Sequence, residues 1–177
     1  MAATFEWDEA NGVSQGTTHN RTECNWKNID DSTTAYSSSP ITAGNNSFDK
    51  WQFGHFSGTY NQILSGLFAH TSGTIATANM TLKGQPTMTA DANRLAYATP
   101  SVSTNANLTF DQSGTIDIAS GRAVWFGADG PGLAGKAASM TTNPCYTNFL
   151  TSQLQTTGSA AAGDTNTLTL TLRYNEN

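Results

Sequence analysis

The chain has 177 residues, of which 37% are hydrophobic, 10% aromatic and only 12% charged, and its formal net charge is −5. This length suits one domain with a good core, and the aromatic content excludes a disordered chain. The few lysines and arginines form no basic stripe and no apolar run approaches the roughly 20 residues of a membrane span, so we expect neither nucleic-acid binding nor membrane insertion.

The N-terminus enters a candidate strand almost at once. This strand runs from Thr4 to Asp8. Because side chains alternate along a strand, Phe5 and Trp7 lie on one face and Glu6 lies with Asp8 on the other. No basic stretch followed by an apolar stretch precedes this strand. We therefore expect synthesis without a secretory signal.

Long polar segments separate the candidate strands. They are Asn11 to Arg21, Tyr36 to Asn46, Thr87 to Ser103 and Gly127 to Ala138. Loops of this length are usually functional, so these segments are the expected contact surfaces of the molecule. Between the first two, Asp30, Asp31 and Ser32 form a turn-like cluster.

Further strands are predicted where apolar and polar residues alternate. These segments are Phe48 to Phe56, Ile63 to His70, Ala76 to Leu82, Leu108 to Phe110 with Ile116 to Ile118 as a hairpin, Ala123 to Phe126, and Thr167 to Tyr174. In the first of them, Trp51, Phe53 and His55 share one face. Pro144 to Leu154 suits a helix or a strand, and we favour a strand because its Thr and Asn content is poor for a helix.

Short strands separated by turn clusters predict an all-β fold. We expect an antiparallel β-sandwich of jelly-roll type with long polar loops, formed by residues 1–177 as a single domain. The first and last strands, TFEWDE and TLRYNEN, share a pattern of apolar, charged, aromatic and acidic residues. This similarity predicts that the two terminal strands lie side by side in one sheet.

We do not predict a catalytic, cofactor-binding or metal-ligating role for any acidic residue or histidine. Glu6 and Asp8 are a possible catalytic couple, with Cα atoms roughly 6.5 to 7 Å apart, but a solvated strand edge is the simpler interpretation. His19, His55 and His70 stand far apart and match no metal-ligand spacing. His55 and His70 could converge in the fold, although core or edge positions are favoured.

Two other features also give no sign of catalysis. The glycine run from Gly127 to Gly132 superficially resembles a phosphate loop, but Lys136 is followed by alanine and the motif fails. Cys24 and Cys145 are expected to be buried thiols, with a disulfide between them left open. An enzyme is therefore not expected.

The four tryptophans admit two interpretations. Trp7, Trp26, Trp51 and Trp125 could form a sugar-stacking platform or belong to the core. We favour the core for Trp51 and Trp125 and leave Trp7 and Trp26 open. A carbohydrate-binding module is therefore one alternative function.

Two stretches carry a resemblance to a known group of proteins. Trp26 to Gly73, WKNIDDSTTAYSSSPITAGNNSFDKWQFGHFSGTYNQILSGLFAHTSG, and the C-terminal QLQTTGSAAAGDTNTLTLTLRYNEN resemble small virion structural proteins of tailed bacteriophages. Together they cover somewhat under half of the chain. The resemblance implies a particle component without a catalytic role.

Among particle components, a head decoration (cement) protein is the first choice, because small size, acidity and the lack of enzymatic motifs all suit it. Such a protein would sit on the outside of the phage head and bind the major capsid protein and sister copies of itself. The alternatives are a tail or adaptor protein and a fibre-associated protein. The chain has no coiled-coil heptads or collagen-like repeat, which weakens the fibre alternative.

Overall fold

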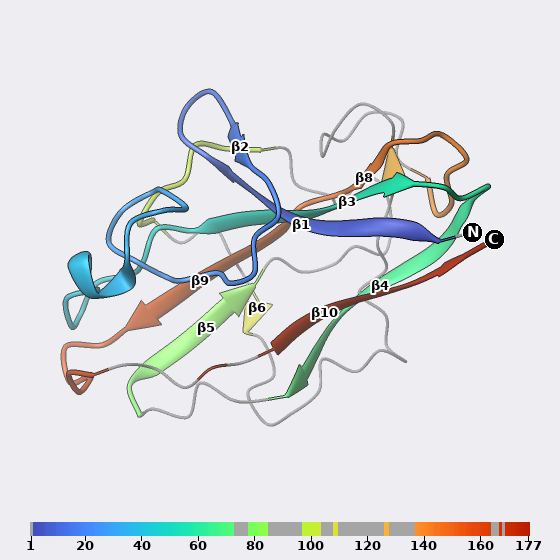
Figure 1. The fold of residues 1–177 in the computed structure, drawn as a ribbon. Helices are drawn as coiled ribbons and strands as arrows, with labels where there is room; N and C mark the ends of the chain where they lie inside the picture. Colours follow the sequence, from blue (N-terminus) through green and yellow to red (C-terminus); the bar gives the residue numbers. More distant parts are fainter. Residues whose placement is uncertain are drawn as a thin grey trace.

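The computed structural model describes residues 2–72, 78–84, 97–103, 108–109, 126–127, 137–163, 167 and 169–177. Within these ranges the chain is nearly all strand and is arranged in two antiparallel sheets (Figure 1). No helix in the described ranges is both long and apolar enough to cross a membrane. The prediction of an all-β, antiparallel fold is therefore confirmed.

The larger sheet is built around β1 and β3, which pair along nearly their whole lengths. Its strand order is β2-β1-β3-β9-β5-β6, and β8 lies between β3 and β7. The bounds of its strands are β1 Ala3–Asn11, β2 Gly16–Thr18, β3 Lys50–Gly58, β5 Met80–Gly84, β6 Leu108–Thr109, β7 Phe126–Gly127, β8 Cys145–Thr147 and β9 Leu150–Thr156. A short 3-10 helix, η1 (Tyr36–Ser38), lies in the long connection between β2 and β3.

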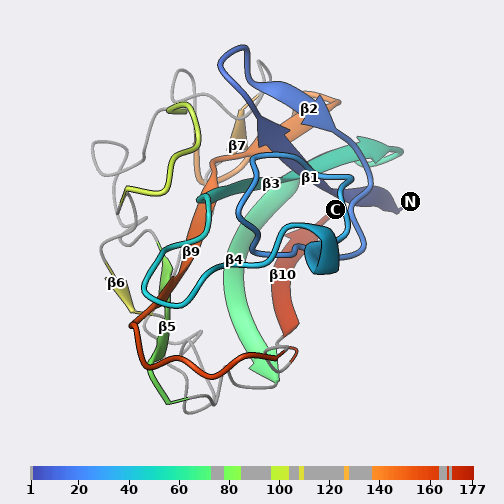
Figure 2. The same ribbon diagram turned by 90° about the vertical axis from the view of Figure 1, so that its left-hand side faces the viewer.

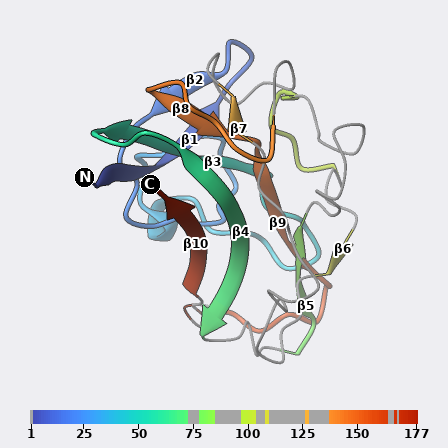
Figure 3. The same ribbon diagram turned by 90° about the vertical axis from the view of Figure 1, so that its right-hand side faces the viewer.

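The smaller sheet consists of β4 (Ile63–Ser72) and β10 (Thr169–Glu176), which pair antiparallel and lie across one face of the larger sheet (Figure 3). Along β10, Leu172 is buried while Arg173 is exposed, as the alternating sequence predicts. A buried apolar cluster joins the two sheets; it consists of Phe56, Tyr60, Ile63, Leu82, Cys145, Leu150, Leu154 and Leu172. The two sheets therefore share a core.

The prediction that the terminal strands share a sheet is wrong. β1 pairs with β2 and β3, whereas β10 pairs with β4 in the other sheet. The chain ends nevertheless lie close together (Figure 1), because the Ala3 backbone N–H donates to Glu176 Oε2 at 2.8 Å and the rings of Phe5 and Tyr174 lie 6.2 Å apart. The shared aromatic pattern reflects contact across the core rather than strand pairing.

Register places the side chains of β1 and β3 on two distinct faces. Phe5 lies opposite Phe56, and Glu6 lies opposite His55. Directly opposed residues point to the same face, so Phe5 and Phe56 face the smaller sheet while Glu6 and His55 face away from it. On that second face Trp51 packs with Ala10, Phe53 and Phe149 in a separate buried cluster, which Tyr97 and Tyr146 border.

Several element boundaries differ from the predicted ones. The polar segment Asn11 to Arg21 contains a short strand, β2, which pairs with the end of β1. Within the strand predicted from Ala76 to Leu82, the described strand β5 begins at Met80, and Ala78 and Asn79 form a turn in which Asn79 has a φ of +70°. Ala76 and Thr77 lie outside the described residues. The segment Pro144 to Leu154 is strand, as favoured, in two pieces.

Some predictions concern residues outside the described ranges. They are the hairpin after Thr109, the strand before Phe126 with Trp125, most of Thr87 to Ser103, and the glycine run up to Lys136. The jelly-roll topology and the single-domain organisation remain predictions.

Candidate functional site

Two lysines are buried on the side of the larger sheet that also carries the shared core: Lys50 in β3 and Lys27 in the connection between β2 and β3. Lys50 Nζ donates to Glu9 Oε1 at 3.1 Å and to the Asp31 carbonyl at 2.8 Å. The Lys50 and Glu9 side chains are each only 1% exposed. Burying two charges is costly unless they are paired and hydrogen-bonded, and here each ion has the other as its partner.

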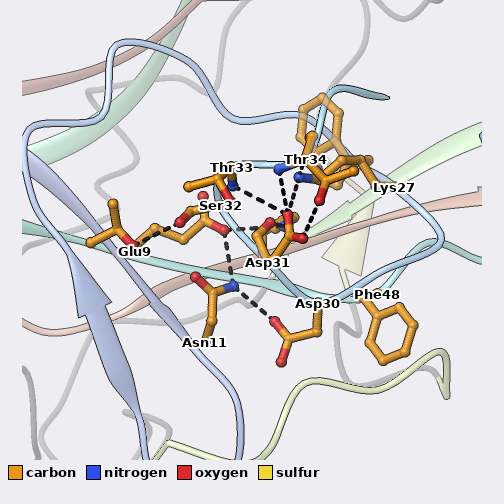
Figure 4. Close-up of polar contacts among 12 residues, drawn as sticks. Glu9, Asn11, Lys27, Asp30, Asp31, Ser32, Thr33, Thr34 and Phe48 are labelled. Carbon is orange, nitrogen blue, oxygen red and sulfur yellow. Dashed lines mark hydrogen bonds and ion pairs between the residues drawn. The ribbon is translucent and has the colours of Figure 1, made fainter. Parts of the chain in front are cut away.

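Asp31 forms the centre of the loop that lies above this ion pair (Figure 4). Its Oδ1 accepts hydrogen bonds from Lys27 Nζ at 2.7 Å and from the Thr34 backbone N–H at 2.9 Å, and its Oδ2 accepts the Thr34 hydroxyl. Burial alone would raise the pKa of Asp31, but the hydrogen bonds from Lys27 and Thr34 outweigh it and hold that pKa well below its usual value. We call Glu9, Lys27, Asp31 and Lys50 the ion-pair cluster.

The same loops are joined to each other by hydrogen bonds between side chains and the backbone. Tyr97 Oη donates to the Gly12 carbonyl at 2.6 Å, and Asn46 Nδ2 donates to the Val102 carbonyl at 3.0 Å. The Asp49 carboxylate accepts the Ser101 backbone N–H at 2.5 Å. Residues 12–49 and 97–103 therefore form one connected structure, which we call the loop layer and which faces the viewer in Figure 2.

The loop layer carries exposed apolar side chains. Val13 is 83% exposed, Tyr36 is 46% exposed and Val102 is 45% exposed. Each of these three residues lies in a different one of the polar segments predicted as contact surfaces. Ile29, also in the loop layer, and Leu64 in β4 are exposed as well. The layer therefore offers apolar contacts on a framework that the ion-pair cluster holds to the sheet.

On the opposite face of β1 and β3, four possible metal ligands converge. They are Glu6, Asp8, His19 and His55, and one ligand atom from each lies within 4.8 Å of all the others. We call them the histidine–carboxylate cluster. Glu6 and Asp8 come from β1 and His55 comes from β3, while His19 follows β2. The strand register accounts for this arrangement, since it places Glu6 directly opposite His55.

Asp8 is the buried centre of this cluster and its two carboxylate oxygens have different partners. Oδ1 accepts the Asn20 backbone N–H at 3.0 Å. Oδ2 lies 2.8 Å from His19 Nδ1 and 3.7 Å from His55 Nδ1. The Asn20 contact thus fixes the carboxylate so that its other oxygen faces both histidines, as an outer hydrogen bond does for a metal-ligating carboxylate.

His55 is held in place without a hydrogen bond to its Nδ1 atom. Its ring stacks on Tyr146 with centroids 4.7 Å apart and an interplanar angle of 16°. Nδ1 is buried and has no hydrogen-bond partner within the described part of the chain, although Glu6 Oε2 lies only 3.6 Å away. A buried ring nitrogen without a partner is costly, so this atom is suited to accept a further ligand.

From the sequence alone, Glu6 and Asp8 stand out as a pair, and the histidines are far apart. The structure brings His19 and His55 to that pair, whereas His70 lies in β4 of the other sheet. Alternation placed Glu6 on one face of β1 with Asp8, and His55 on one face of β3 with Trp51 and Phe53. Alternation along a strand does not show which strands pair, and the pairing of β1 with β3 is what brings these groups together.

The tryptophans and cysteines lie in the interior. Trp51 is 1% exposed and belongs to the core, as predicted, while Trp7 and Trp26 are partly buried against the core between the sheets. Cys145 is fully buried and Cys24 is partly buried, and both are thiols. Burial, with a contribution from the Glu9 carboxylate, raises the pKa of Cys24 to about 12, so this thiol is a poor nucleophile.

The chain matches no protein-family model, and no curated protein or solved structure is significantly similar to it.

Proposed function

We propose that this protein is a non-enzymatic structural component of a tailed-phage virion, of the head decoration type. In this role the protein binds the outside of the capsid and bridges neighbouring copies of the major capsid protein. The observation that carries the proposal is the loop layer, in which exposed apolar residues lie on long polar segments held to a rigid sheet. The resemblance of Trp26 to Gly73 to phage structural proteins points to the same class.

The hydrogen bonds that join the segments of the loop layer favour an interaction role. Binding costs less when the contacting loops are ordered beforehand, because less conformational freedom is lost. The loop that carries Ile29 is ordered by Lys27, and the connection from η1 to β3 is tied to Val102 through Asn46. Many copies on one particle would multiply a modest contact through multivalency.

The described tryptophans give less support to the carbohydrate-binding alternative. Stacking on sugars needs exposed, coplanar aromatic rings, whereas Trp7, Trp26 and Trp51 pack against the two cores. Their rings instead contribute to holding the sandwich together. We therefore place decoration ahead of sugar binding.

The first test is the location of the protein and the strength that it adds to the particle. Antibody-gold labelling of intact virions is expected to mark heads, and virions assembled without the protein are expected to release their genome at a lower temperature. Gold on tails would support the adaptor alternative instead. Particles that lack the protein and are as heat- and pressure-resistant as wild type would contradict the proposal.

The second test uses the exposed apolar residues. The triple variant Val13→Ser, Tyr36→Ser and Val102→Ser is expected to bind protein-free particles at least tenfold more weakly, since each lost apolar contact contributes about 1 kcal/mol. Leu64→Ser is the matched control, because Leu64 is 40% exposed but lies in β4, outside the loop layer. Equal loss of binding in both proteins would exclude the loop layer as the contact surface.

A further inference from the structure

We propose that the histidine–carboxylate cluster of Glu6, Asp8, His19 and His55 is a structural zinc site. The inference does not depend on the virion role, because it rests only on the geometry of β1, β3 and the turn after β2. Two imidazoles and two carboxylates are a ligand set that zinc uses. Imidazole nitrogens make the set unsuited to Mg²⁺ and Ca²⁺, which take oxygen ligands.

The distances fit a tetrahedral ion with little rearrangement. Ligands about 2.0 to 2.1 Å from zinc stand roughly 3.3 to 3.5 Å apart at the corners of a tetrahedron. His55 Nδ1 lies 3.6 Å from Glu6 Oε2 and 3.7 Å from Asp8 Oδ2. The His19 Nδ1 to Asp8 Oδ2 separation, at 2.8 Å, is a hydrogen-bond distance that has to open, and the remaining separations are all within 4.8 Å.

Two observations beyond the clustering point to a bound cation. The Asp8 side chain is completely buried; Asn20 and His19 already supply hydrogen bonds to it, and a cation would add positive charge beside this buried carboxylate. Among the residues that the structure describes, the buried His55 Nδ1 has no hydrogen-bond partner, although two carboxylate oxygens lie less than 4 Å away. A zinc ion between these atoms would satisfy both groups together.

The surroundings allow the ion to enter and then hold it. The His19 side chain is 62% exposed, so the site opens to solvent on that side. The turn that carries His19 is fixed by the Asn20 N–H bond to Asp8 and by an Arg21 N–H bond to the Trp7 carbonyl at 2.6 Å. Four protein ligands complete a tetrahedron, as in structural zinc sites, so the ion would join this turn to the sheet.

The test measures zinc binding and thermal unfolding of the untagged full chain after treatment with a chelator. We expect one zinc ion per chain, and a rise in Tm of roughly 5 to 10 °C at a free zinc concentration 100 times the Kd. Mg²⁺ and Ca²⁺ at the same concentrations should leave Tm unchanged. Co²⁺ in place of zinc should give the visible absorption of a tetrahedral complex.

Variants assign the effect to this cluster. His19→Ala and Glu6→Gln are expected to weaken zinc binding at least tenfold, and both residues are exposed enough for the fold to survive, which circular dichroism checks. His70→Gln is the matched control, since it removes the remaining histidine in the other sheet and should leave the affinity unchanged. The proposal would be overturned if the protein bound no zinc, or if His19→Ala bound zinc as tightly as wild type. It would also be overturned if Cys24→Ser alone abolished binding.

Discussion

Two charged clusters lie back to back on the same pair of strands and differ in how their charges are compensated. In the ion-pair cluster each lysine has a carboxylate and a backbone carbonyl as partners: Lys50 contacts Glu9 and Asp31, and Lys27 contacts Asp31 and Thr34. In the histidine–carboxylate cluster the groups that face the two carboxylates are histidines, and His55 Nδ1 has no hydrogen-bond partner among the described residues.

This difference indicates different roles for the two clusters. A buried cluster that already contains its counter-ions holds loops in place and has no need of a ligand. A cluster with two carboxylates and an unpartnered ring nitrogen can gain from a cation. The former orders the loop layer proposed to contact the particle, and the latter is the proposed zinc site.

The largest expected effect is the loss of Lys50. Lys50→Met leaves Glu9 as an uncompensated buried charge and is expected to lower the free energy of unfolding by about 3 to 5 kcal/mol, as measured by urea denaturation. The double variant Glu9→Gln with Lys50→Met removes both charges and should recover at least half of that loss. A change below about 0.5 kcal/mol in the single variant would show that the ion pair is not buried in solution.

A smaller effect is expected for Asp31, and it depends on pH. Folding lowers the pKa of Asp31 below its ordinary value of 3.8, so its contribution to stability is present above pH 3.8 and is lost as the pH falls toward the folded-state pKa. Asp31→Asn should lower the free energy of unfolding at pH 7 by about 1 to 3 kcal/mol.

The pH dependence provides the check on this assignment. Between pH 5 and pH 2, urea denaturation of Asp31→Asn should show a shallower loss of stability than wild type, because the variant has no carboxylate to protonate at this position. Parallel pH profiles for the two proteins would contradict the stabilising role of Asp31.

The smallest effect is expected for His55 in the protein kept free of metal by a chelator. His55→Phe retains a ring that can stack on Tyr146 and removes a nitrogen without a hydrogen-bond partner, so the free energy of unfolding should change by about 1 kcal/mol or less. In the presence of zinc the same variant should fail to gain the Tm increase of the wild-type protein. A large loss in the chelated protein would mean that His55 already has a polar partner in the absence of metal.

Local sequence patterns predicted the longer strands but located the ends of the strands less accurately. Alternation predicted β1, β3 and β10, and it placed Trp51 with Phe53 and His55 on one face, because the two-residue period of a strand is visible in the chain itself. It missed β2, which has only three residues and owes its conformation to pairing with the end of β1. It also extended β5 through Asn79, whose left-handed conformation belongs to a turn.

The sequence by itself determined an all-β chain with alternating faces and two acidic residues on the outer face of its first strand. Only the tertiary structure decided that β10 pairs with β4 instead of β1, and that His19 and His55 meet Glu6 and Asp8. The physical reason is that alternation is a local property of the backbone, whereas pairing depends on which faces bury the most apolar surface together. Contacts between residues distant in the chain follow from that choice.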